Sequence, residues 1–350
     1  MKLKTVGVLV LSVLSLSGCI STGINDYTRL SSDIHRQVFY ALKQAGISPD
    51  YQVKAQYNEN VIDQNRWLSL DLEYQVPTQV DWQSLVANVD DRLTSFNHKM
   101  RYSSQAPPVN KLEIDVVSKN LSMVHITVSQ KVLGELAFVI DDLGYNTKAL
   151  DAALLIDRPI TYAVLPQLAK SKFLAEKFNE RGNLIILHQP MASKKGSDPG
   201  AGAIYSKMSE QEIKKLIEEN LKTVPHAKGV NNHMGSLITS DEKIMTVVLG
   251  FLKQQKLFFL DSITSKTICR KVARRLGFPI YRRDVFIDNK KNKPYIKGQI
   301  DQLIKITLKH GKGIGIGHFF PITLQTILEK LPEIESKGIK LVYLNELPRD

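Results

Sequence analysis

Two adjacent carboxylates, Asp141 and Asp142, stand at the end of the apolar run Leu136–Ile140. The run is rich in β-branched and aromatic residues, which is typical of a strand that is buried on both faces. Two acids side by side repel each other, so keeping both ionised requires a cation or shifted pKa values. The alternative is a pair of acids that caps a helix in the loop after the strand. The pattern favours a catalytic or metal-binding position.

Other polar side chains also stand after apolar runs farther along the chain. Three of the eight histidines and two more aspartates occupy such positions. They are His188, His233, Asp261, Asp288 and His318. A single histidine near an apolar run is usually a structural residue, but the shared position of these side chains after strand-like runs indicates one common site.

The segments that carry these residues alternate between strand-like and helix-like runs from Leu136 to the end. Strands are predicted near Leu136–Asp141, Ile160–Leu165, Asn183–Leu187, Gly229–Asn231, Leu257–Leu260, Pro279–Tyr281, Gly313–Gly317 and Ile339–Leu344. Helices are predicted near Thr147–Ile156, Ala169–Arg181, Glu210–Thr223, Asp241–Gln255, Lys266–Leu276, Gly298–Lys309 and Thr323–Ser336. This alternation predicts parallel strands covered by helices, in a doubly wound sheet or an α/β barrel. In both folds the carboxyl ends of the strands lie on one side, so the candidate residues should meet there.

Two imidazoles and one carboxylate are a sufficient ligand set for a catalytic divalent metal with open positions. Water bound to such a metal has its pKa lowered to about 7 and attacks a carbonyl or phosphoryl centre. A neighbouring carboxylate can take the proton of the water, and a histidine on the opposite side can protonate a leaving nitrogen. The residue types therefore predict a hydrolase that uses zinc or another divalent transition metal.

The repeat Gly311-x-Gly313-x-Gly315-x-Gly317 looks like a phosphate-binding loop. It precedes and forms a strand instead of opening a helix, so the phosphate-loop interpretation is disfavoured. We interpret the repeat as closely packed backbone of the barrel.

The chain has 350 residues, a hydrophobic content of 43% and a net charge of +12. These values indicate a globular protein of two domains, or of one large domain with an appendage. The lysines and arginines are scattered, and no basic stripe alternates with aromatic residues, so we expect no nucleic-acid partner. An anionic cell envelope, or solubility alone, explains the positive charge.

The first 18 residues resemble a lipoprotein signal peptide. Lys2 and Lys4 precede the apolar run Val6–Leu16, which is too short for a permanent membrane span. The run leads to Cys19, the position that is lipidated in bacterial lipoproteins, and Ile20 after it favours the outer membrane, facing the periplasm. An ordinary export signal is the alternative. Cys269 is the only other cysteine, and we expect it to be a buried thiol.

Residues 19–26 form a predicted tether, and residues 27–131 form a predicted small α+β domain. Its predicted elements are helices at Ile34–Ala45 and Asp81–Phe96, a strand at Trp67–Tyr74, and a hairpin of Leu112–Val117 with Met123–Val128. The domain holds no cluster of catalytic residue types, so it is interpreted as a spacer or a binding module.

The string Asp141-Asp142-Leu143-Gly144-Tyr145 and the string Asn231-Asn232-His233-Met234-Gly235-Ser236 resemble motifs of the divergent polysaccharide deacetylase family. This family is a branch of the polysaccharide deacetylase superfamily. The resemblance covers residues 135–350 and implies a distorted (β/α) barrel. It also implies metal-dependent removal of acetyl groups from polymeric sugars.

The resemblance implies a role for each matching residue. Asp141 is the expected base, His318 the expected acid and Asp261 its orienting partner. Asp142 and His233 are the expected metal ligands. The superfamily has a second histidine where this chain has Leu237, and His188 is proposed as its replacement. Candidate substrate-binding residues are Asn232, Ser236 and Asp288.

The leading hypothesis is a lipid-anchored envelope deacetylase that acts on an N-acetylated polysaccharide or on peptidoglycan. A second hypothesis is a glycan-binding or scaffold lipoprotein with a vestigial site, because Leu237 and Ile263 depart from the family pattern. A third is a phosphohydrolase, although imidazole ligands suit zinc better than magnesium.

Overall fold

The computed structural model describes residues 23–76, 80–105, 110–263 and 265–349. The predicted signal peptide, Cys19 and the first half of the tether lie outside the described residues. The chain divides into two compact units. The first holds residues up to Tyr74, Asp81–Ser104 and Leu112–Val128, and the second holds Gln75–Val80, Gln105–Lys111 and Ser129–Asp350. No helix within the described ranges is long and apolar enough to cross a membrane.

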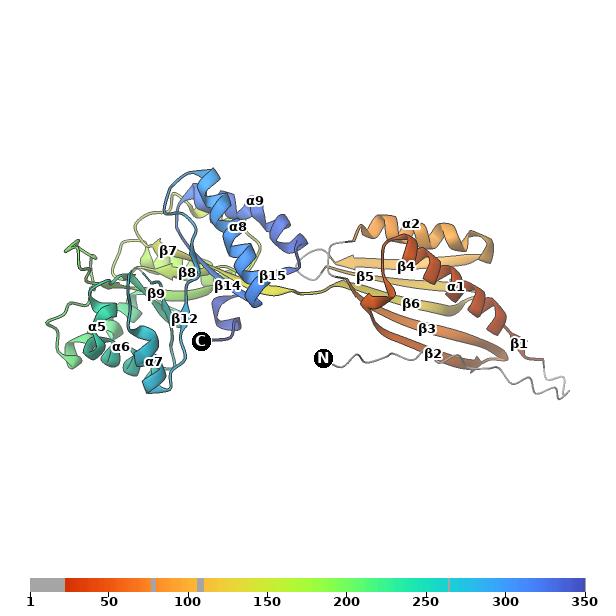
Figure 1. The fold of residues 1–350 in the computed structure, drawn as a ribbon, viewed down its shortest axis with the longest axis horizontal. Coiled ribbons are helices and arrows are strands. Elements are labelled where there is room, and N and C mark those ends of the chain that lie inside the picture. The colour runs from red at the N-terminus through yellow and green to blue at the C-terminus, as the bar shows by residue number, and fades with distance from the viewer. Residues whose placement is uncertain (1–22, 77–79, 106–109, 264, 350) are drawn as a thin grey trace. The chain divides into compact units, whose positions relative to one another are not determined.

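The first unit is a six-stranded sheet with two helices (Figure 1). Its elements are β1 (Asn25–Asp26), α1 (Thr28–Gln44), β2 (Gln52–Ile62), β3 (Asn65–Val76), α2 (Trp82–Leu93), β4 (His98–Gln105), β5 (Lys111–Ser118) and β6 (Leu121–Gln130). The strand order is β1-β3-β6-β5-β4, with β2 beside β3. The predicted helices, strand and hairpin are confirmed. The strands β2 and β4 were not predicted because their residues are mostly exposed and polar.

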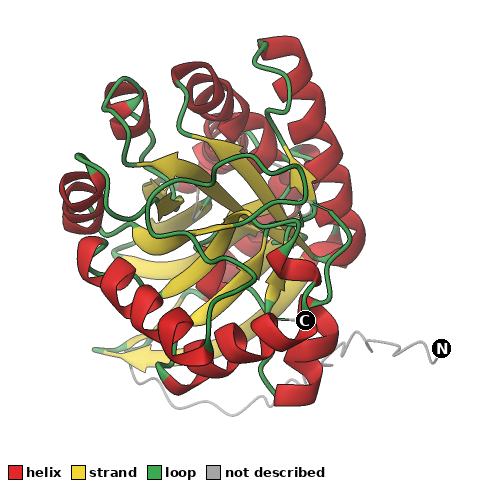
Figure 2. Ribbon diagram, turned by 90° about the vertical axis from the view of Figure 1, so that its left-hand side faces the viewer, coloured by secondary structure: helices red, strands yellow, loops and turns green. Residues whose placement is uncertain are grey.

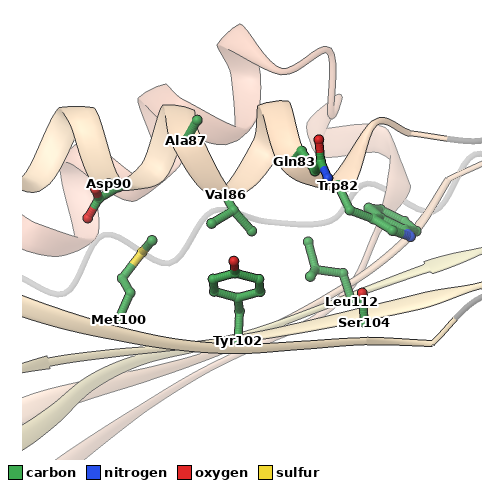
Figure 3. A pocket seen from close by; sticks show the side chains of 9 residues that line it. All are labelled: Trp82, Gln83, Val86, Ala87, Asp90, Met100, Tyr102, Ser104 and Leu112. Carbon is green, nitrogen blue, oxygen red and sulfur yellow. The ribbon is translucent and has the colours of Figure 1, made fainter.

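A pocket of about 590 Å³ lies between α2 and the edge strand β4. Figure 3 shows Val86 of the helix facing Tyr102 of the strand, with Trp82 at one end. At the other end Asp90 contacts the ring of His98 at 2.8 Å, which gives that histidine a structural partner. The volume lies within the ~300–1,000 Å³ of pockets that take small molecules.

The second unit is a curled parallel sheet surrounded by helices (Figure 2). Its strands are β7 (Gly134–Leu143), β8 (Thr161–Val164), β9 (Leu184–Met191), β10 (Gly229–Met234), β11 (Phe258–Asp261), β12 (Tyr281–Arg282), β13 (Val285–Phe286), β14 (Lys312–His318) and β15 (Ile339–Leu341). Its helices are α3 (Leu150–Leu154), α4 (Ser171–Glu180), α5 (Glu210–Thr223), α6 (Glu242–Gln254), α7 (Cys269–Leu276), α8 (Lys293–His310) and α9 (Pro321–Ser336). The predicted barrel-type fold is confirmed as a parallel half-barrel.

The strand order of this sheet is β12-β11-β10-β9-β8-β7-β14-β13, with β15 also beside β7. Two residues, Arg283 and Asp284, connect the edge strands β12 and β13. The backbone N–H of Arg283 donates to Asp261 on one side, and that of Asp284 donates to Ile314 on the other. This short link therefore bridges the two edges of the curled sheet.

The central strand β7 is buried on both faces, as its apolar sequence predicts. Leu136, Phe138 and Ile140 pack in the cluster that includes the helices, whereas Ala137 and Val139 pack in a second cluster formed by strand residues and the C-terminal segment. Burial on both faces explains why the run lacks the alternation of a half-exposed strand.

The glycine repeat is closely packed backbone, as predicted. A Cβ atom on Gly315 would lie 2.5 Å from Cδ2 of Leu303 in α8, and one on Gly317 would lie 2.8 Å from Cγ1 of Ile287. The missing side chains therefore let α8 and the segment after β13 approach β14 closely.

Candidate active site

Asp141 and Asp142 occupy a bulge of β7. Ile140 pairs with Tyr162 and Leu143 pairs with Val164, so β7 uses one residue more than β8 over this interval. Asp142 has a φ of +65°, in the left-handed region that non-glycine residues rarely adopt. Successive residues of a regular strand point to opposite faces, and the bulge removes this alternation. Both carboxylates consequently lie against His188.

Three candidate metal ligands meet at this end of the sheet. Oδ1 of Asp142 lies 3.2 Å from Nε2 of His188 and 3.1 Å from Nδ1 of His233. The two imidazole nitrogens lie 3.1 Å apart. The three residues come from β7, β9 and β10, and together they can hold a metal ion. The strands that the sequence predicted thus bring the three predicted ligands to one point.

The arrangement of these donors fits a divalent cation. Oδ1 of Asp142 is buried and has no hydrogen bond of good geometry, although both imidazoles lie close to it. Nδ1 of His188 lies 2.7 Å from Oδ1 of Asn231, so that nitrogen carries the proton and Nε2 keeps a lone pair for a metal. Two imidazoles and one carboxylate with open positions form a typical catalytic set for zinc.

The same contacts control the charge of Asp142. Burial alone would raise the pKa of this carboxyl group, but the imidazoles of His188 and His233 outweigh burial and hold the pKa well below its ordinary value. The group is therefore an anion over the whole physiological range, as a metal ligand must be.

Asp141 is 2% exposed and lies beside the three ligands. Its Oδ1 accepts a hydrogen bond of 2.8 Å from the amide of Asn231, and its Oδ2 lies 3.7 Å from Nε2 of His188. Burial raises the pKa of Asp141, and the nearby imidazoles of His188 and His318 oppose this effect. A carboxylate with a raised pKa is well suited to accept a proton.

His318 ends β14, the strand next to β7, and is paired in register with Asp141. Its Nδ1 lies 2.8 Å from Oδ1 of Asp288, and its backbone N–H donates to Oδ2 of the same carboxylate at 2.7 Å. Thr323 donates a third hydrogen bond to Asp288. Burial lowers the pKa of His318, but Asp288 outweighs burial and raises this pKa to about 9.

The orienting partner of His318 is Asp288, and the prediction of Asp261 was wrong. β13, which precedes Asp288, pairs directly with β14, and Oδ1 of Asp288 lies 2.8 Å from Nδ1 of His318. Oδ1 of Asp261 accepts from the backbone N–H of Ile263 at 3.0 Å, and burial raises the pKa of this carboxyl group.

The candidate substrate-binding residues are engaged within the protein. Both polar atoms of the buried Asn232 bind backbone, at Met234 and at Ser262, which contradicts its predicted contact with substrate. Ser236 accepts a hydrogen bond from the backbone N–H of Lys194, so it connects the loop after β10 to the loop after β9. Asp288 is hydrogen-bonded to His318, as described above.

Sequence reasoning missed Asn231 and the aromatic residues around His318. Asn231 lies two residues before His233 in β10, and residues two apart share a face of a strand, so this spacing could have identified it. The ring of Phe286 lies nearly parallel to that of His318 with centroids 6.0 Å apart, and the ring of Phe320 is tilted against that of His318 with centroids 5.7 Å apart. No sequence signal distinguished these phenylalanines from core residues.

Comparison with known proteins agrees with this arrangement. Residues 138–348 match the sequence profile described as divergent polysaccharide deacetylase. The chain belongs to the divergent polysaccharide deacetylase family. The match contains the residues of the candidate site from Asp141 to His318, and it does not include the first unit.

Two bacterial relatives share this sequence similarity. The uncharacterized protein YibQ of Escherichia coli K12 is 34% identical over 212 residues, which are 59% of this chain and 66% of that protein. An uncharacterized protein of Haemophilus influenzae is 33% identical over 217 residues, 61% of this chain and 78% of that protein. The match thus spans slightly less than two thirds of YibQ.

A solved structure shares the fold. The uncharacterized protein ATU2773 of Agrobacterium tumefaciens aligns with a TM-score of 0.59 and 20% identity, over 61% of this chain and 89% of that one. At this identity the likeness concerns the fold alone. The half-barrel is therefore a known architecture, and the function has to be argued from the site.

Proposed function

We propose that the protein is a metal-dependent hydrolase that removes acetyl groups from an N-acetylated polysaccharide of the cell envelope, or from peptidoglycan. The observation that carries the proposal is the convergence of Asp142, His188 and His233 beside a buried carboxylate, Asp141, and a cationic imidazole, His318. Membership of the family supports the choice of an acetylated sugar polymer as substrate.

Asp142, His188 and His233 would hold the metal. When bound, a divalent cation supplies a Lewis acid that polarises the acetyl carbonyl and lowers the pKa of an attacking water. Asp141 accepts the proton that the water loses, and its burial favours this transfer. His318 is protonated at neutral pH and donates its proton to the leaving nitrogen, so that acetate and a free amine result.

The test is release of acetate from chitooligosaccharides and from peptidoglycan fragments by the metal-loaded protein. Asp141→Asn and His318→Gln should each lower the rate by about 10²–10⁴-fold, the usual contribution of a general base or acid. Absence of metal-dependent acetate release from every glycan tried, together with retained glycan binding, would instead support a binding protein with a vestigial site.

We also propose that the chain is anchored to the outer membrane through a lipid on Cys19. The apolar run before Cys19 and the residue Ile20 after it support this proposal, and both lie outside the described residues. Replacement Cys19→Ser should move the protein from the membrane fraction to the soluble periplasmic fraction. Unchanged fractionation would contradict the anchor without affecting the proposed chemistry.

A further inference from the structure

The loops that follow the carboxyl ends of the strands carry many exposed lysines. They include Lys148 after β7, Lys194 and Lys195 after β9, Lys266 after β11, and Lys290 and Lys291 after β13. The acids on the loops after the strands are Asp198, Asp241, Asp284 and Asp288. Asp241 caps the first turn of α6, Asp284 accepts a hydrogen bond from the backbone N–H of Ile314, and Asp288 is buried against His318, so Asp198 is the exposed acid that makes none of these contacts. In a parallel α/β fold these loops surround the mouth of the site.

The positive charges of these lysines have no carboxylate partner. Within the ranges that the structure describes, none of the six forms an ion pair, whereas Lys293 and Lys297 farther along the chain both bind Glu329. Charges of one sign around a cleft create a field that attracts ligands of the opposite sign. The positive field at this mouth therefore favours an anionic ligand.

Lys291 is the lysine that the structure ties most directly to the acid His318. Its Nζ lies 3.8 Å from the ring centroid of Phe320, and that ring lies 5.7 Å from the ring of His318. The contact with Phe320 holds the ammonium group beside the mouth, yet it leaves hydrogen-bond donors of Nζ free for a ligand.

We propose that the substrate of this site is an anionic glycan, an N-acetylated polymer whose sugars carry carboxylate or phosphate groups, and that Lys291 determines this specificity by binding one such group. This inference rests on the proposed function for the nature of the polymer. It goes beyond that function because a neutral chitin-like polymer would fit the metal and its acid and base equally well.

The experiment measures binding of matched oligosaccharides to the full chain loaded with zinc, carrying Asp141→Asn so that the probe is not consumed. The probes are chitohexaose, which is neutral, a hyaluronan hexasaccharide, which has a carboxylate on every second sugar, and chitohexaose 1-phosphate. Both anionic probes should bind more tightly than chitohexaose, by about tenfold or more if several lysines contribute, and the advantage should shrink as salt is added.

Three variants assign the preference to Lys291. Lys291→Ala should weaken binding of the hyaluronan hexasaccharide by up to about fivefold and leave chitohexaose unaffected. Lys291→Arg should restore it, because arginine keeps the charge and packs on an aromatic ring. Lys309→Ala removes the same charge from the last turn of α8 and should change neither affinity.

The outcomes separate this inference from the proposed function. Equal affinity for neutral and anionic probes, or an equal loss for all probes in Lys291→Ala, overturns the inference. Acetate release from chitohexaose as fast as from hyaluronan also overturns it and leaves the proposed function standing. A salt-sensitive preference for both anionic probes that Lys291→Ala weakens supports the inference, even if the active chain releases no acetate and the proposed function fails. A preference that Lys291→Ala leaves unchanged overturns the role of Lys291.

Discussion

Asn231 accepts a hydrogen bond of 2.7 Å from Nδ1 of His188, across the adjacent strands β10 and β9. The amide nitrogen of the same side chain donates to Oδ1 of Asp141 at 2.8 Å. One buried amide thus sets the tautomer of a metal-binding imidazole and orients the expected base. The amide of Asn231 can make both contacts because it has an acceptor oxygen and a donor nitrogen.

Replacing Asn231 should therefore weaken metal binding. In Asn231→Leu the Nδ1 proton of His188 loses its acceptor, so the ring is no longer fixed, and zinc affinity should fall by roughly 10–100-fold. The measurement is zinc affinity by competition with a chelator of known strength. Asn232→Ala is the matched control, because the amide of Asn232 binds only backbone and its loss should lower stability without lowering zinc affinity. Equal zinc affinity in both variants would contradict the role of Asn231.

Removal of the metal should destabilise the second unit. Since the three ligands lie together only in the folded chain, zinc at about 100 times its Kd should raise the free energy of unfolding by about 2.7 kcal/mol. The shift is read from thermal unfolding with zinc and with EDTA. His233→Ala should abolish it, whereas His310→Ala, at the end of α8, should retain it. A shift that persists in His233→Ala would place the zinc elsewhere.

The activity should decline at high pH through His318. Asp288 raises the pKa of this imidazole to about 9, so the proton-donating form is complete at neutral pH and is lost as the pH rises through about 9. In Asp288→Asn the carboxylate is gone, and the upper limb of the pH–rate profile should move toward the ordinary histidine value of about 6.5. NMR titration of His318 checks the assignment without turnover. If the upper limb does not move in Asp288→Asn, the decline at high pH belongs to a group other than His318.

The glycines of β14 should not tolerate a methyl group. In Gly315→Ala the new Cβ would lie 2.5 Å from Leu303, and overpacking of this kind costs about 1–3 kcal/mol of stability. Gly298→Ala in α8 meets no atom within 4 Å and should stabilise the helix by about 0.5–1 kcal/mol. Denaturant unfolding of the two variants gives both values. Equal stability of the two variants would contradict the close approach of α8.

The sequence was sufficient for the half-barrel and for the meeting of its three predicted ligands. Buried parallel strands are apolar along their whole length, so the polar residue that ends each strand is easily recognised. The sequence did not predict that Asp288 is the partner of His318. The strand before Asp288, β13, has only two residues, and its pairing with β14 depends on how the sheet curls. The strand β4 was missed because it is an exposed edge strand without a hydrophobic alternation.

The orientation of Asp141 and Asp142 depends on the one residue by which β7 exceeds β8 at the bulge. Deletion of a single codon at this point would leave a regular strand of the kind that any parallel sheet accepts, and the fold could persist. Asp141 and its neighbour could then no longer face the same partner, since the alternation of a regular strand would separate them. A relative that lacks this one residue should therefore keep the architecture and lose the chemistry, a distinction that overall similarity alone would not reveal.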